Sequence, residues 1–440
     1  MYDRDTYVKK KCGVLLSLSG VGVSPSSQAD AHKYQDSHRR KHSSNSKLSG
    51  SEWTFGMTNA WVLCPGRQGA HNFEGTGLLV AMESLNALKN LKTVPKDKQV
   101  DITRVVYAGH SRGGHGSLLL GVKMPDVACG IVASNGWIRR EYYADANPIF
   151  EHDLSLSHTF PFVIRQVFES SISENDVGLT HENIVDIPIT IRTCTDDQSV
   201  SPWFMRRMAR ILSSNHVVDL EFRELDNNLG HWWWNTKKTN DGGALFDAYF
   251  RKRYKSAFKS CNNNINNNNN TFVVVSLNPS TFHGKHGIRI LSQDRTMAYS
   301  KIYCTLNNMV EISTSNVLRF KVNINQLFDN SITKSNKIIV DGIVFHYDDL
   351  VNTINNNNKS GSSSSNNNNN NEIIFVQNKN VVSKDRWEIF DSTRNNLWRL
   401  QYGPMRRVFD HDFLVVIGTS NVENYKSNVE AATFISNSHF

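Results

Sequence analysis

A serine between small residues is the first feature of this chain that could do chemistry. Residues 105–116 read V-V-Y-A-G-H-S-R-G-G-H-G, so Ser111 lies in a Gly-x-Ser-x-Gly pentapeptide after an apolar run. In a nucleophile elbow, a serine occupies a strained strand-to-helix turn and needs small neighbours, here Gly109 and Gly113. The turn exposes the hydroxyl and directs backbone N–H groups toward it. This context favours a nucleophilic Ser111 over an ordinary turn.

A nucleophilic serine needs a general base and a carboxylate that orients the base. Asp196 and Asp197 follow an apolar run at 187–193, and His231 follows another at 219–225. The order Ser, Asp, His is that of elbow serines, and strand ends are where open α/β sheets hold their sites. We therefore predict that His231 accepts the proton of Ser111 and that Asp196 orients the imidazole. Asp197 is the alternative acid. A turn or helix cap for the aspartates, and a packed role for His231, are the structural alternatives.

An oxyanion formed at Ser111 needs two backbone donors. The N–H of Arg112, directly after the serine, is the first candidate. The second is Gly20, in the loop Leu18-Ser19-Gly20-Val21-Gly22 that follows the first strand-like run. Its glycines allow close backbone approach, although a plain tight turn explains them equally well.

Residues that could contact a substrate occur in an insert over 137–187 and beside His231. Trp137, Arg139 and Tyr142 could line a pocket there, or form the surface of a cap helix. Trp232 is the first of three successive tryptophans. It could wall the pocket, whereas core packing is the more common fate of such rings.

The elements that must position these residues alternate along the first half of the chain. The apolar runs lack period-two alternation, as strands covered on both faces should. Their order predicts a doubly wound, mainly parallel α/β sheet. Strands are expected at 13–18, 60–64, 104–108, 129–133, 187–193 and 219–225, and helices at 77–91, 115–123, 160–170 and 202–213.

The second half is rich in short β-branched runs and predicts a β-rich, sandwich-like domain. Strands are expected at 272–277, 287–291, 317–324 and 338–345. Two asparagine-rich stretches cannot bury apolar surface and are interpreted as disordered inserts. We predict a catalytic α/β domain at 1–260, a linker at 261–270, a β-rich domain at 271–385 with an insert at 355–371, and an incomplete α/β segment or sandwich extension at 386–440.

Composition excludes several classes of function. The net charge of +8 comes from scattered basic residues, which favours a solvated surface over a nucleic-acid footprint. The six cysteines are widely spaced without a C-x-x-C pair, so we expect free buried thiols, no disulfide framework and no metal site. No cofactor is implied. Without a membrane-length apolar stretch or signal peptide, we expect no membrane association and a cytoplasmic protein.

With elbow, acid and base in place, residues 13–258 resemble the catalytic domain of prolyl oligopeptidase-type serine peptidases. That family carries its acid in an Asp-Asp-x-Val type turn, here Asp196 to Val200 with one extra residue. The resemblance implies that Asp196 is the acid and that Gln198 contacts a substrate carbonyl. Residues 230–234, Gly-His-Trp-Trp-Trp, resemble a divergent branch, as do Gly403–Val408 and Val416–Thr419.

Two departures bear on the substrate. The family's early loop often reads His-Gly where this chain has Ser19-Gly20, and no repeat typical of its β-propeller precedes the catalytic half. The resemblance implies a serine-type peptidase acting through an acyl-enzyme on peptides. A carboxylesterase acting on small esters is the alternative, because Gly-His-Ser is common in esterase elbows. A non-catalytic binding protein on the same scaffold is the third hypothesis.

Overall fold

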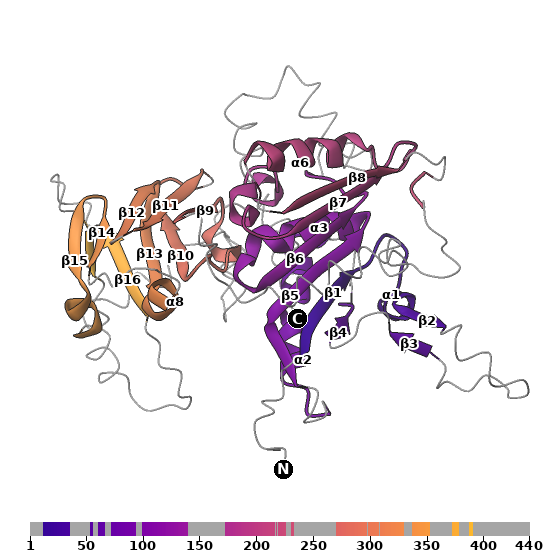
Figure 1. The fold of residues 1–440 in the computed structure, drawn as a ribbon, viewed down its shortest axis with the longest axis horizontal. Coiled ribbons are helices and arrows are strands. Elements are labelled where there is room, and N and C mark those ends of the chain that lie inside the picture. Colours follow the sequence, from indigo (N-terminus) through magenta and orange to yellow (C-terminus); the bar gives the residue numbers. More distant parts are fainter. Residues whose placement is uncertain are drawn as a thin grey trace, which may run out of the picture. The chain divides into compact units, whose positions relative to one another are not determined.

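A computed structural model of the chain contains one parallel sheet with helices and two further sheets that share a second core (Figure 1). The structure describes residues 12–35, 53–55, 60–66, 72–93, 99–139, 172–215, 217, 219–225, 230–232, 270–296, 298–307, 309–329, 337–352, 372–377 and 387–389.

The parallel sheet has six strands in the order β4-β1-β5-β6-β7-β8. All five neighbouring pairs are parallel, which confirms the predicted doubly wound sheet. Every residue of β7 is buried, as expected for a strand covered on both faces. The strands are β1 (Cys12–Leu18), β4 (Ala60–Leu63), β5 (Val100–His110), β6 (Ala128–Ser134), β7 (Ile189–Cys194) and β8 (Leu220–Leu225).

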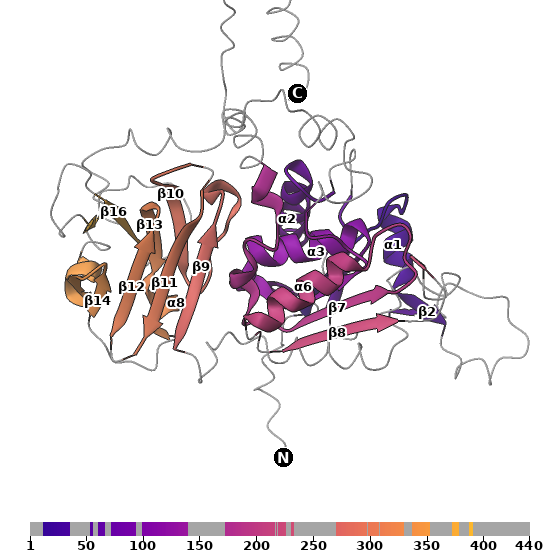
Figure 2. The ribbon, with the colours of Figure 1, turned by 90° about the horizontal axis from the view of Figure 1, so that it is seen from above.

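Helices pack against this sheet and complete its core (Figure 2). Helix α3 (Arg112–Lys123) contacts β1, β5 and β6, and all of its residues are buried. Helix α6 (Trp203–Ser214) contacts β7 and β8, while α2 (Thr76–Lys89) contacts β5. The predicted helix at 160–170 lies outside the described residues. Smaller elements of this part are α1 (Pro25–Ala31) and the antiparallel pair β2 (Lys33–Gln35) and β3 (Trp53–Phe55).

The register of the strands brings distant residues to one edge of the sheet. Leu18 of β1 is level with Gly109 of β5, and His110 is level with Ser134 of β6. Ser134 is in turn level with Arg192 of β7. Because these strands are parallel, the residues that follow each of them meet at the same carboxyl edge. Ser111 and the loops after β1, β6 and β7 therefore lie at this edge.

The second part consists of two sheets on either side of one apolar core. In the core, the rings of Phe320 and Phe375 are stacked with centroids 5.0 Å apart. One sheet has the order β10-β13-β16-β17 and the other β15-β14-β12-β11-β9. The elements are β9 (Thr271–Ser276), β10 (Ile288–Gln293), β11 (Ser300–Leu306), β12 (Val310–Ser315), β13 (Val317–Asn323), α8 (Ile324–Asp329), β14 (Lys337–Val340), β15 (Ile343–His346), β16 (Glu372–Gln377) and β17 (Trp387–Ile389).

The structure corrects the predicted strands of this part. The run at 338–345 is not one strand but the hairpin β14–β15. Asp341 and Gly342 lie between the two strands with φ of 46° and 91°, the left-handed backbone that a two-residue hairpin turn requires. Strands β11, β12, β16 and β17 were missed. β11 alternates buried residues with less buried ones, a pattern that is obscured because Ser300 is polar at a buried position and Tyr303 is a large ring at the exposed one.

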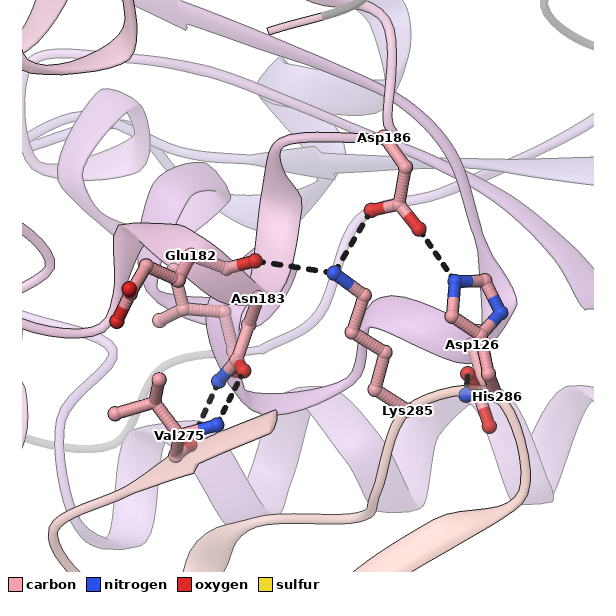
Figure 3. Close-up of polar contacts among 8 residues, drawn as sticks. Asp126, Glu182, Asn183, Asp186, Val275, Lys285 and His286 are labelled. Atoms are coloured by element: carbon pink, nitrogen blue, oxygen red, sulfur yellow. Dashed lines mark hydrogen bonds and ion pairs between the residues drawn. The ribbon is translucent and has the colours of Figure 1, made fainter. Parts of the chain in front are cut away.

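Polar groups connect the two parts (Figure 3). The side chain of Asn183 is buried and pairs with the backbone of Val275 in β9, through two hydrogen bonds of 2.8 Å. Oδ1 of Asp186 forms an ion pair with Nζ of Lys285 at 3.1 Å, and Oδ2 lies 2.5 Å from Nε2 of His286. Burial alone raises the pKa of Asp186, but the charges of Lys285 and His286 outweigh burial and hold that pKa below its ordinary value.

Candidate active site

Ser111 adopts the strained conformation expected of an elbow. Its φ and ψ are 60° and −121°, a region that side chains rarely enter and that costs about 1–3 kcal/mol. Its N–H donates to the carbonyl of Ser134 at 2.8 Å, and its carbonyl accepts from the N–H groups of Gly114 and His115. Strand β6 and helix α3 thus hold the serine from both sides.

The elbow glycines are required by close packing of α3 against its neighbours. A Cβ on Gly113 would lie 1.9 Å from the carbonyl oxygen of Leu18 in β1. A Cβ on Gly114 would lie 2.5 Å from the carbonyl oxygen of Ser134, and one on Gly109 would lie 2.2 Å from that of Gly113. Any larger residue at these positions would push α3 away from the sheet and displace the turn.

His231 is paired with Asp197, and not with the predicted Asp196. Nδ1 of His231 lies 2.7 Å from Oδ2 of Asp197, whose side chain is fully buried. The other oxygen, Oδ1, accepts from the N–H groups of Ser199 and Val200 at 2.8 Å each. These two bonds orient the Asp197 carboxylate, which leaves Oδ2 directed at the imidazole. His231 is therefore paired with the alternative acid and not with the predicted Asp196, whose buried Oδ2 has no hydrogen-bond partner among the described residues.

The Asp197 contact determines which nitrogen of His231 could act on a substrate. An ionised carboxylate only accepts hydrogen bonds, so Nδ1 carries the proton and Nε2 keeps its lone pair. No hydrogen bond joins Ser111 Oγ to His231, both of which belong to the described part of the chain. Such contacts are often long in the absence of substrate.

His110 and Asn135 hold His231 beside the elbow through its backbone carbonyl. Nε2 of His110 lies 2.9 Å from that carbonyl oxygen, and Nδ2 of Asn135 donates to it at 3.3 Å. The rings of His110 and His231 have centroids 4.5 Å apart. Since a carbonyl can only accept, His110 must carry a proton on Nε2.

His110 is buried and held neutral. Burial is the main cause that lowers the pKa of His110 well below its ordinary value, and the nearby charges of His231 and Arg192 lower this pKa further. We did not predict a role for His110. The only signal in the sequence is its place directly before the elbow serine.

Both predicted oxyanion donors lie beside Ser111. Arg112 is the first residue of α3, where backbone N–H groups have no acceptor within the helix. Gly20 is buried, and a Cβ built on it would lie 3.8 Å from Cβ of Ser111. A further contact was not predicted: Nη2 of Arg112 donates to the carbonyl oxygen of Gly20 at 2.5 Å.

The predicted substrate contacts have different surroundings. Trp232 is 42% exposed, with its ring 4.9 Å from that of His110 and 5.6 Å from that of His231, between centroids. Gln198 is exposed in the turn after Asp197, and Arg139 is partly buried. Tyr142 lies outside the described residues.

Trp137 does not line an open surface, contrary to the prediction. It is 1% exposed and stacks on His115 with ring centroids 5.3 Å apart. Nδ1 of His115 lies 3.0 Å from the carbonyl of Trp137, and its Nε2 lies 3.0 Å from Oε1 of Glu74. No sequence pattern indicates this buried network, which links the loops before α2 and after β6 to α3.

The described residues were also compared with the expectations for metal ligands, cysteines and membrane-spanning helices. None of them form a group of three His, Cys, Asp or Glu side chains that could hold a metal ion. Cys12, Cys64, Cys194 and Cys304 are free, but Cys129 is disulfide-bonded, contrary to the expectation of free thiols throughout. No described helix is long and apolar enough to span a membrane.

Several solved structures are distantly similar to this chain. No family model and no curated protein matches the sequence. SOBER1 of Arabidopsis thaliana is 17% identical, with a TM-score of 0.30 over 56% of this chain and 99% of that one. An S-formylglutathione hydrolase from Agrobacterium tumefaciens is 14% identical, with a TM-score of 0.36 over 57% and 84%. An acylaminoacyl peptidase of Pyrococcus horikoshii is 10% identical, with a TM-score of 0.34 over 56% and 36%. At these values the similarities carry no argument about the family, the activity or the substrate of this chain.

Proposed function

We propose that this chain is a serine hydrolase that works through an acyl-enzyme, with Ser111 as nucleophile, His231 as general base and Asp197 as the orienting acid. The observation that carries the proposal is the 2.7 Å contact between His231 and Asp197, beside a serine with φ of 60°. A buried carboxylate that orients an imidazole, next to a strained and small-flanked serine, is the arrangement that activates a hydroxyl for acyl transfer.

The reaction follows from the atoms in place. Oγ of Ser111 attacks a carbonyl carbon while Nε2 of His231 accepts its proton, and Asp197 stabilises the imidazolium. The negative carbonyl oxygen of the tetrahedral intermediate accepts from the N–H groups of Arg112 and Gly20. The intermediate then collapses: the bond to the leaving group breaks, and His231 returns the proton to that group. Water repeats the sequence on the acyl-enzyme and releases the acid.

Peptide bonds are the substrate class that we propose. The support is the resemblance of the Asp-Asp turn and of Gly230-His231-Trp232 to prolyl oligopeptidase-type peptidases. Trp232 offers an exposed ring next to His231 for an apolar or proline side chain. The same triad would cleave small esters, so a carboxylesterase is the alternative, supported by the Gly-His-Ser sequence of the elbow.

A fluorophosphonate probe tests the nucleophile directly. The full chain should be labelled at Ser111, and the Ser111→Ala variant should not be labelled. A cooperatively melting chain that does not react would contradict the proposal and favour a non-catalytic role. Hydrolysis of a proline anilide and of a short-chain nitrophenyl ester then separates the two classes: peptidase activity predicts turnover of the anilide, whereas turnover of the ester alone favours the esterase.

A further inference from the structure

Arg112 presents a buried positive charge next to the nucleophile. The residue is 2% exposed, and its only hydrogen bond within the described structure is the 2.5 Å contact from Nη2 to the carbonyl of Gly20. Its Nε is buried without a partner, and no carboxylate of the described residues pairs with the guanidinium. A buried cation without a counter-charge is unfavourable for folding. Its position therefore points to a reaction in which negative charge develops nearby.

We infer that Arg112 is a positioning residue for the oxyanion site: its guanidinium holds the Gly20 loop against Ser111 and supplies positive charge where the oxyanion forms. The inference rests on the proposed acyl-transfer function and assigns to the side chain a role separate from that of its backbone N–H.

The geometry couples the two halves of the oxyanion site through one residue. The backbone of Arg112 starts α3 directly after Ser111, while its side chain reaches a loop 92 residues earlier in the chain. Because a peptide unit is planar, fixing the carbonyl of Gly20 fixes the orientation of its peptide plane. Gly20 also contacts the elbow, since a Cβ built on it would lie 3.5 Å from the carbonyl oxygen of His110. Loss of the guanidinium would remove the hydrogen bond that holds the Gly20 carbonyl.

A purely structural role for Arg112 predicts a different outcome from a role in oxyanion stabilisation. A structural brace would lower thermal stability and affect ground-state and transition-state binding alike. A residue that positions oxyanion donors would affect the tetrahedral state selectively, so kcat would fall while KM stays nearly constant. A phenylboronic acid forms an anionic tetrahedral adduct with an active serine. Its dissociation constant therefore measures how well the site stabilises the tetrahedral state.

The experiment compares Arg112→Gln with the wild-type chain and with Arg206→Gln as a matched control. Nε of Arg206 donates to Glu224 at 2.8 Å on the surface formed by α6 and β8, so the control removes an arginine outside the site. We expect Arg112→Gln to lower kcat about 10- to 100-fold and to weaken phenylboronic acid to a similar extent, with KM changed less than about threefold. The control should leave all three values within about twofold.

An active wild type whose kcat and boronic acid affinity are unchanged in Arg112→Gln overturns this inference alone. A wild type that neither reacts with fluorophosphonate nor turns over a substrate overturns the proposed function and the inference together. If Arg112→Gln fails to melt cooperatively, the same measurements of kcat and of boronic acid affinity are made on Arg112→Lys. Lysine keeps the charge but lacks the guanidinium fork. A selective loss of at least about threefold in kcat and in boronic acid affinity supports the inference, and unchanged values overturn it.

Discussion

Replacing Asp197 by asparagine should nearly abolish activity without unfolding the protein. Oδ1 of Asp197 accepts two backbone N–H groups at 2.8 Å, from Ser199 and Val200, and Oδ2 faces Nδ1 of His231 at 2.7 Å. The two N–H groups require an oxygen, so the amide oxygen of the asparagine must occupy the Oδ1 position. Its NH₂ group then faces His231 and can only donate. The imidazole must accept at Nδ1, which moves its proton to Nε2, where it cannot take the proton of Ser111.

The reversed orientation of the amide is the unfavourable one. It would leave the N–H groups of Ser199 and Val200 facing an NH₂ group, and the buried Val200 N–H alone would then cost about 1–3 kcal/mol as an unsatisfied donor. A change of imidazole tautomer breaks no backbone hydrogen bond, so the unproductive tautomer should win. Enzymes in which such an aspartate was replaced by asparagine lose on the order of 10⁴-fold in kcat, which corresponds to about 5 kcal/mol.

Asp196→Asn is the matched control, because it removes the same charge one residue away. We expect its kcat to stay within about threefold of the wild type, since Asp196 does not contact His231. Both variants should keep a cooperative thermal transition, with activity measured as steady-state ester hydrolysis and as the rate of fluorophosphonate labelling. A large loss in Asp196→Asn together with an active Asp197→Asn would refute this assignment and restore Asp196 as the acid.

Four further predictions test the site and the contacts between the two parts. His110→Phe should lower kcat about fivefold, because one hydrogen bond to the His231 carbonyl, worth about 1 kcal/mol, is lost, whereas His110→Gln should retain most of the rate. Because the pKa of His110 is lowered in the folded state, the unfolded chain binds a proton more readily below about pH 6.5, and the free energy of unfolding should decrease as the pH is lowered through this range. His110→Gln should show a shallower pH dependence of the free energy of unfolding in denaturant titrations. An equal slope in the variant and the wild type would count against a neutral buried ring. Gly113→Ala should prevent stable folding, since its Cβ would lie 1.9 Å from a carbonyl of β1, while Gly66→Ala, with nothing within 4 Å, should melt as the wild type does. Asp186→Asn should lower stability near neutral pH by removing the ion pair with Lys285. The pKa of Asp186 is depressed on folding, so its contribution is present above about pH 4 and lost as the pH falls further; a deficit that persists unchanged at pH 3 would contradict this reasoning.

The sequence was sufficient for the parallel sheet because buried strands and amphipathic helices leave direct patterns. The apolar run at 104–108 predicted the middle of β5, and the helix predicted at 115–123 is α3, which begins earlier, at Arg112. The choice between Asp196 and Asp197 could not be made in the same way. Adjacent aspartates share the same local sequence, and only the turn that directs two N–H groups to Oδ1 of Asp197 aims its other oxygen at His231. That turn is a property of the folded backbone.

The contacts that hold the site together explain what sequence reasoning missed. Four side chains at the carboxyl edge of the sheet bind backbone carbonyls of other loops: Arg112 binds that of Gly20, His110 and Asn135 bind that of His231, and His115 binds that of Trp137. A carbonyl acceptor is present in every residue, so the loop that receives the bond carries no identifying side chain. The donors are recognisable only after the strand register has placed them. It follows that these contacts restrict the backbone of the receiving residue and not the type of its side chain. Arg112 provides the sharpest case, because its guanidinium has no other hydrogen-bond acceptor among the described residues.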